Sequence, residues 1–104
     1  MPNYTVKNIE KVVVGTDVQA RVFTLAPGDV IPWHYHGEST DHYFVLRGDL
    51  TIETRAPDTR YVLGVGERFK IEPGTAHRIS NEATTECQFL LLQGIGKYDW
   101  HSAG

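Results

Sequence analysis

Residues 28–36 of this chain read Gly28-Asp29-Val30-Ile31-Pro32-Trp33-His34-Tyr35-His36 and carry two histidines separated by one residue. Side chains on an extended strand alternate between its two faces, so His34 and His36 point to the same side. Because a divalent metal binds an imidazole nitrogen at about 2.1 Å, one ion could contact both rings. His-x-His pairs also occur on solvated strand faces without a metal, so the pair alone leaves both interpretations open. His77 is the distant histidine that could complete a site.

Around this segment the sequence consists of short apolar runs separated by turns. Turn residues recur about every 8–12 residues, a spacing typical of all-β sandwiches and barrels. No long stretch keeps a helical period, although residues 8–11 could form one helical turn. The turns Pro27-Gly28 and Pro73-Gly74 each precede a histidine-bearing segment, which suits a small barrel in which two segments bring ligands to one interior point. Strands are predicted at residues 12–14, 19–25, 30–35, 42–46, 50–54, 60–63, 68–71, 76–80 and 86–93.

Length and composition narrow the classes of protein that fit. The 104 residues predict one domain, 1–104, with a core at about 19–93 and a C-terminal tail at 94–104. A net charge of −3 without a basic stripe argues against nucleic-acid binding. No apolar run reaches the roughly 18 residues that a membrane span needs. The chain start lacks the apolar region of a secretory signal and Cys87 is the single cysteine, so we expect a cytoplasmic protein.

The spacing of glycines, histidines and one acidic residue resembles the two motifs of the cupin family. The first motif runs glycine, five residues, His-x-His, three or four residues, an acidic residue, six residues and glycine. Residues 28–48 match it, with Asp41 in the acidic position where the family usually has glutamate. Residues 66–81 are similar to the second motif, with Glu72 in place of the family's proline. The two motifs together span roughly half of the chain.

This resemblance implies an all-β fold, a small double-stranded β-helix barrel related to the jelly roll. It also implies a metal site in which His34, His36 and His77 supply nitrogen ligands and Asp41 supplies a carboxylate. Glu38, in the loop between His36 and Asp41, is the rival carboxylate and is expected in solvent. The implied cofactor is one divalent transition metal ion, Fe, Mn, Ni, Zn or Cu.

Cupins with such a site catalyse oxygenation, isomerisation or decarboxylation, and some only bind a ligand. We therefore expect a metal-dependent enzyme, an oxygenase or isomerase acting on a small polar or aromatic metabolite. The alternative is a non-catalytic module that binds a small molecule or a metal. Tyr43 is the candidate catalytic residue, because it shares a strand face with Asp41 and could donate a hydrogen bond to a bound oxyanion; a core aromatic role is the other interpretation.

Several further residues have two open interpretations. His42 points away from the Asp41 face and is expected on the outer wall or at a subunit contact. Outward aromatic side chains at Trp33 and Phe44 could supply the apolar patch of a homodimer. The aromatic tail at 94–100 could cover the barrel mouth or fold onto a partner subunit. Four cationic residues in strands could pair with an acidic substrate or lie on solvated faces, namely Arg21, Arg68, Lys70 and Arg78.

Overall fold

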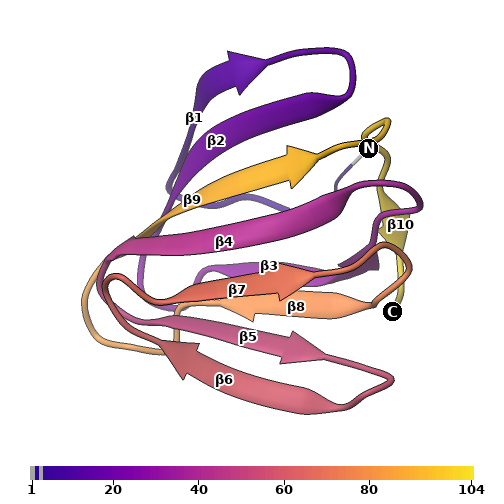
Figure 1. Cartoon of the computed structure of the whole chain (residues 1–104). Coiled ribbons are helices and arrows are strands. Elements are labelled where there is room, and N and C mark those ends of the chain that lie inside the picture. The colour runs from indigo at the N-terminus through magenta and orange to yellow at the C-terminus, as the bar shows by residue number, and fades with distance from the viewer. Residues whose placement is uncertain (1, 3) are drawn as a thin grey trace.

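Two antiparallel five-stranded sheets face each other and form a barrel (Figure 1). The computed structural model describes residue 2 and residues 4–104. The first sheet has the order β1-β2-β9-β4-β7, and the second has the order β10-β3-β8-β5-β6. This arrangement confirms the predicted all-β fold of the double-stranded β-helix type. The strands are β1 (Asn8–Val14), β2 (Val18–Leu25), β3 (Val30–Tyr35), β4 (Thr40–Arg47), β5 (Leu50–Thr54), β6 (Thr59–Leu63), β7 (Arg68–Ile71), β8 (His77–Ser80), β9 (Cys87–Gly94) and β10 (His101–Ser102).

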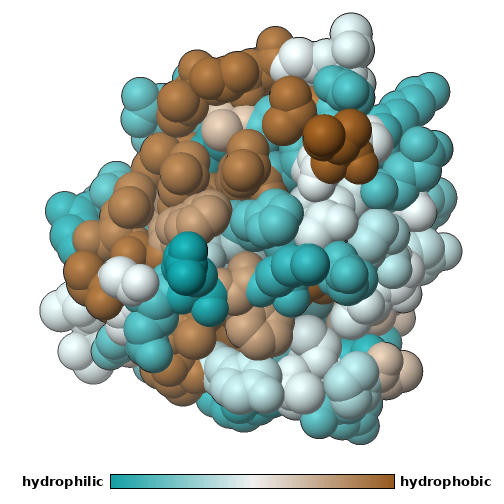
Figure 2. All heavy atoms as spheres, viewed as in Figure 1, coloured by the Kyte–Doolittle hydropathy of each residue, from teal (hydrophilic) through white to brown (hydrophobic). Residues whose placement is uncertain are grey.

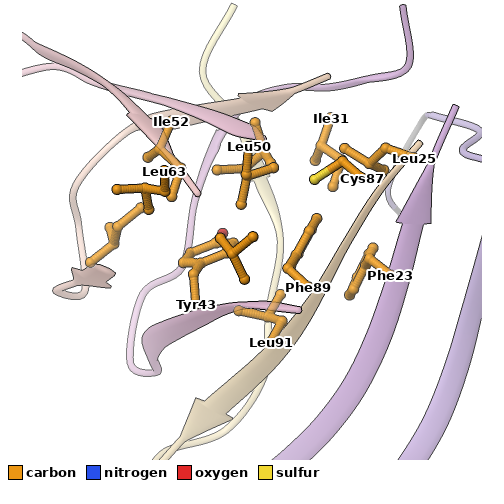
Figure 3. Packing of buried hydrophobic residues seen from close by; sticks show 13 residues of the cluster. Phe23, Leu25, Ile31, Tyr43, Leu50, Ile52, Leu63, Cys87, Phe89 and Leu91 are labelled. Carbon is orange, nitrogen blue, oxygen red and sulfur yellow. The ribbon is translucent and has the colours of Figure 1, made fainter. Parts of the chain in front are cut away.

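The apolar core lies between the two sheets and is built from alternate residues of the central strands (Figure 3). Phe23 on β2 and Phe89 on β9 are paired in the register and their rings stack with centroids 5.1 Å apart. Beyond this pair, toward the other end of the barrel, the inward residues are Arg21 on β2 and Leu91 and then Gln93 on β9. The interior therefore changes from apolar to polar along its length, which places the polar residues at one end.

A β-bulge in β3 gives this strand its inward histidine, His34. Ile31 is buried and pairs with Ile79 of β8, and the next register pair is His34 with His77, with a shift between the two pairs. Without this shift, Ile31 and His34 would point to opposite faces, because side chains of a regular strand alternate. The extra residue thus lets one strand contribute both to the apolar core and to the polar end.

The N-terminal strand differs from the prediction. Residues 8–11 do not form a helical turn, because they belong to β1, whose backbone pairs with β2 at the edge of the first sheet. All seven residues of β1 are exposed, so this strand is held by its backbone pairing and not by burial of its side chains. Within the described residues, no helix is long and apolar enough to span a membrane.

Gly48, between β4 and β5, is the glycine with the tightest surroundings. Its φ angle is +74°, and a Cβ atom there would lie 2.3 Å from the carbonyl oxygen of Glu86. Gly66 has a similar φ of +86° but no atom within 4 Å of its would-be Cβ. Alanine substitutions at the two positions therefore separate the energetic cost of backbone strain from that of steric overlap.

We expect Gly48→Ala to destabilise the fold by at least about 2 kcal/mol, because strain and a backbone clash add. Gly66→Ala, the matched control, should cost only about 1 kcal/mol from the left-handed conformation. Urea denaturation of both variants measures the difference. Equal losses in the two variants would show that the contact with Glu86 is relieved without cost.

Candidate metal centre

Four residues from separate segments converge at the polar end of the barrel. His34 lies on β3, His36 follows that strand, Asp41 lies on β4 and His77 opens β8. Their candidate ligand atoms all lie within 4.8 Å of one another, and all four side chains are at most 3% exposed. Glu38 is exposed and is not part of this group. The group therefore contains the four residues that the sequence singled out.

Backbone carbonyl groups fix the orientation of all three imidazole rings. The Nδ1 atoms of His34, His36 and His77 lie 2.7 Å from Pro32 O, 2.6 Å from Asp99 O and 2.8 Å from Thr75 O, respectively. A carbonyl oxygen only accepts, so each Nδ1 carries the proton and donates. In its neutral form each ring then keeps a lone pair on Nε2, which is the arrangement that metal-binding histidines adopt.

Asp41 is the buried carboxylate at the centre of the group. Its Oδ2 accepts a hydrogen bond from the Tyr43 hydroxyl at 2.9 Å, and its Oδ1 accepts one from Gln93 Nε2 at 3.0 Å. Oδ2 also lies 3.1 Å from His77 Nε2 and 3.4 Å from His36 Nε2. Burial alone would raise the pKa of this carboxyl, but the adjacent His36 and His77 rings, in their protonated forms, outweigh it and hold the pKa well below its usual range.

The protonation of the neighbours follows from the same contacts. Burial and then the charge of Asp41 hold the pKa of Tyr43 well above its usual value, so the phenol stays protonated. Burial opposes protonation of His36, but its hydrogen bond to Asp41 and the charge of that carboxylate raise the pKa. Burial, followed by the nearby His77, lowers the pKa of His34 from 6.5 to about 3. His34 is therefore a neutral ring at ordinary pH.

One atom of the group has no hydrogen-bond partner, and this tests whether a cation would fit. His77 Nε2 is buried and unpartnered among the described residues, because its 3.1 Å approach to Asp41 is not directed as a hydrogen bond. A lone pair buried in this way is costly unless a hydrogen-bond donor or a cation binds it. Three imidazole nitrogens and one carboxylate suit a divalent transition metal, so the residues fit the ion that the resemblance implies.

The C-terminal tail closes the barrel mouth over these residues. The Trp100 ring stacks on His34 with centroids 3.8 Å apart and planes at 10°, and β10 pairs with β3. Asp99 ties the tail down, since its Oδ1 accepts from the Gly37 backbone at 2.7 Å and its carbonyl accepts from His36. Of the two roles left open for the tail, the chain itself adopts the first. The cavity that remains beneath the tail has a volume of about 10 Å³, enough for roughly one water molecule or ion.

Sequence reasoning missed Gln93 and gave Asp99 and Trp100 no individual role within a tail for which two roles were open. Gln93 contacts Asp41. The sequence pattern could have identified it, because it continues the inward series 87, 89 and 91 of β9 but is polar. Asp99 and Trp100 had no comparable signal, because their positions depend on how the tail packs. Arg21, for which a solvated face and an acidic partner were both open, lines the cavity beside His34 and His36.

The other residues with open roles lie away from the site. His42 is half-buried on the outer side of β4. Arg78 points outward and pairs with Glu53 at 2.7 Å. Trp33 lies under the Arg55 guanidinium, 3.8 Å from its ring centroid, so this aromatic face is already covered.

Comparison with known proteins gives a consistent result. A family model described as a cupin domain matches residues 21–93. A comparison with curated proteins gave no match. The chain is similar in structure to a protein with a double-stranded β-helix domain from Klebsiella pneumoniae (TM-score 0.81, 21% identity, covering 100% of this chain and 90% of that one).

Two further structural neighbours have described activities. One is an oxalate oxidase in complex with glycolate, with a TM-score of 0.77 and 20% identity over 91% of this chain. The other is a Lactobacillus farciminis oxalate decarboxylase with formate, with a TM-score of 0.74 and 18% identity over 84% of this chain. This chain spans 54% of the oxidase and 27% of the decarboxylase. At these identities the likeness shows a shared fold.

The depressed pKa of His34 predicts how the metal-free protein responds to acid. Between about pH 6.5 and about pH 3 the unfolded chain binds a proton at this residue and the folded chain does not, so the free energy of unfolding falls as the pH falls. From about pH 7 to about pH 4, wild type should lose roughly 3 kcal/mol more than His34→Asn, measured by urea denaturation. Equal losses would mean that His34 titrates normally in the folded protein.

Proposed function

This chain belongs to the cupin family, and on that premise we propose that it is a metal-dependent enzyme acting on a small polar or aromatic metabolite. In this proposal His34, His36, Asp41 and His77 hold one divalent transition metal ion. The observation that carries the proposal is the convergence of these four buried side chains, with each Nδ1 already donating to a carbonyl. A structural role would not require three rings to direct their free nitrogens to one point.

The residues around the four ligands have separate tasks in this proposal. When bound, the metal can polarise a substrate oxygen, orient the substrate or lower the pKa of a bound water. Gln93 and Tyr43 hold the Asp41 carboxylate through both of its oxygens. Trp100 and its neighbours in the tail keep bulk water away from the site, which strengthens every charge interaction inside it.

Tyr43 remains our proposed catalytic residue, with a more specific role. Its hydroxyl donates to Asp41 and is held protonated, so it can serve as a hydrogen-bond donor but not as a base. A donor at this carboxylate limits how much negative charge the metal receives from it. That catalysis depends on this hydroxyl stays a prediction.

Oxygenation and isomerisation remain the two candidate reactions, and the non-catalytic binding module is the alternative. The oxalate oxidase neighbour supports testing oxygen consumption first. The small free space at the site favours the metal-binding form of the alternative, because a substrate or other small molecule can reach the metal only if the tail moves. Metal analysis of untagged protein purified without added metals or chelators is the first experiment. Oxygen uptake and sugar isomerisation by the loaded protein then separate an enzyme from a binding module.

We expect the double variant His34→Ala/His36→Ala to lose metal retention and yet stay folded, because the apolar core lies deeper in the barrel. Elemental mass spectrometry measures the metal content, and circular dichroism measures the fold. His42→Ala, one position from Asp41 but on the outer side of β4, is the control and should keep its metal.

Two results of this experiment would contradict the assignment. Full metal content in the double variant would place the ion elsewhere on the chain. Unfolding of the double variant, with His42→Ala folded and metal-bound, would mean that the histidines act mainly as structural groups.

We also propose that the chain forms a homodimer through the outer face of the first sheet. The register aligns Val22, Leu90 and Phe44 across β2, β9 and β4, and Figure 2 shows apolar side chains gathered over these strands. The same row ends at Glu10 on β1 and at Arg68 on β7. Two copies packed face to face about an axis parallel to the strands would place each Glu10 over the partner's β7 edge, where Arg68 lies. This charge match favours a second copy as the partner.

The cytoplasmic location stays a prediction.

Leu90→Glu should convert this dimer to a monomer, because it places a charge in the middle of the apolar row. Sedimentation velocity at about 100 µM protein measures the change. The dissociation constant of the dimer should rise more than tenfold. Tyr61→Glu, at an exposed aromatic position on the second sheet, is the control and should leave the dimer intact. A monomeric wild type would overturn the proposal.

A further inference from the structure

Arg21 places a positive charge in the wall of the cavity that holds the candidate ligands. Arg21 lies on β2 and continues the inward series of Leu25 and Phe23. Its Nη2 donates to Gln93 Oε1 at 2.5 Å, and its guanidinium lies over the Phe23 ring, 5.0 Å from the centroid. Its Nε is buried and has no hydrogen-bond partner among the described residues. Arg21 is therefore a partly satisfied cation that faces the site.

The second unpartnered donor of this cavity is the indole N–H of Trp100. Trp100 Nε1 is buried and has no acceptor within the described part of the chain. Its ring lines the same cavity as Arg21 and stacks on His34. A buried N–H without an acceptor typically costs about 1–3 kcal/mol, so two of them in one cavity call for an explanation. Both would be satisfied by a ligand with acceptor oxygens.

No protein group in the cavity is available as the counter-charge of Arg21. Among the described residues it forms no ion pair, and Asp41 is engaged by Tyr43, Gln93 and the histidines. Tyr4 and Tyr98 also line the cavity, but burial raises the pKa of both phenols and keeps them neutral. With a divalent cation in place, one carboxylate would face three positive charges. The cavity as built is short of negative charge.

We propose that Arg21 and the indole N–H of Trp100 form an anion subsite beside the candidate metal, and that this subsite takes a small carboxylate. A carboxylate has two acceptor oxygens, which matches two separate donors. The cavity has room for roughly one water molecule, so a carboxylate enters it only when the tail shifts, and a small one requires the smallest shift. The inference rests on the proposed function only for the neighbouring metal, since Arg21 and Trp100 are present without it.

Titration calorimetry with glycolate tests this subsite on both Mn²⁺-loaded and metal-free protein. We expect glycolate to bind wild type at least tenfold more tightly than its neutral amide, glycolamide. Arg21→Gln should weaken glycolate binding by roughly 10–100-fold, and Arg21→Lys should restore only part of it, because lysine lacks the planar donor set. Trp100→Phe keeps the stacking on His34, removes the N–H, and should weaken binding by roughly 3–10-fold.

Three controls make each outcome decisive. Arg78→Gln removes an outward arginine that pairs with Glu53 and should bind glycolate as wild type does. Metal content is measured on every variant, and Arg21→Gln should keep its metal. If Arg21→Gln does not fold, Trp100→Phe and Arg21→Lys carry the test. Sulfate and phosphate are titrated in parallel, and either one competing as well as glycolate would overturn the choice of a carboxylate.

The failures of the two proposals are distinguishable. A protein that retains metal, but binds glycolate equally well in wild type and Arg21→Gln, overturns the subsite and leaves the metal site standing. A protein that retains no metal, yet binds glycolate through Arg21, supports the subsite and removes the proposed function. Equal affinity for glycolate and glycolamide, or no binding of glycolate in either form of the protein, overturns the subsite.

Discussion

A carboxylate that is removed from water needs donors to replace its hydration, and Asp41 obtains them from several strands at once. Tyr43 donates from the same strand and Gln93 donates across the sheet. His77 Nε2 lies 3.1 Å from the carboxylate, on the opposite sheet. An uncompensated charge in this position would cost several kcal/mol. The strands of the two sheets must therefore keep their relative position for Asp41 to stay ionised, and the spacing of the histidines depends on the same arrangement.

The apolar core supplies that relative position. Phe23 and Phe89 stack beneath the polar end, and Tyr43 joins the two regions because its ring contacts Phe89 while its hydroxyl contacts Asp41. Since close-packed interiors transmit small displacements, a change in the core would alter the distances between the candidate ligands. The bulge in β3 is the second requirement, because it alone allows Ile31 to face the core and His34 to face the site.

The resemblance to the cupin motifs implied the ligand set, including His77. Strand parity supplied the orientations of the side chains. It predicted that His34 and His36 share a face, that Asp41 lies with Tyr43, and that His42 points away. Those inferences need only the alternation of a single strand. Contacts with Arg21 and Trp100 depend on the register between distant strands and on the path of the tail, which local patterns do not encode. The helical turn expected at residues 8–11 failed for a related reason, since pairing with β2 overrides a weak local preference.

The tail that closes the barrel mouth and the unpartnered N–H groups of Arg21 and Trp100 beneath it need a common explanation. If the tail served only to seal the barrel, an apolar side chain in place of Trp100 would do so without burying an N–H, and a neutral residue at Arg21 would avoid a cation with a buried, unpartnered Nε. The chain instead keeps both groups beside an arrangement suited to a metal ion. The contacts of Asp99 that hold the tail also affect the site, because the carbonyl of Asp99 fixes the tautomer of His36. Opening the mouth would therefore release a candidate ligand from its partner, which couples access to the site with its geometry.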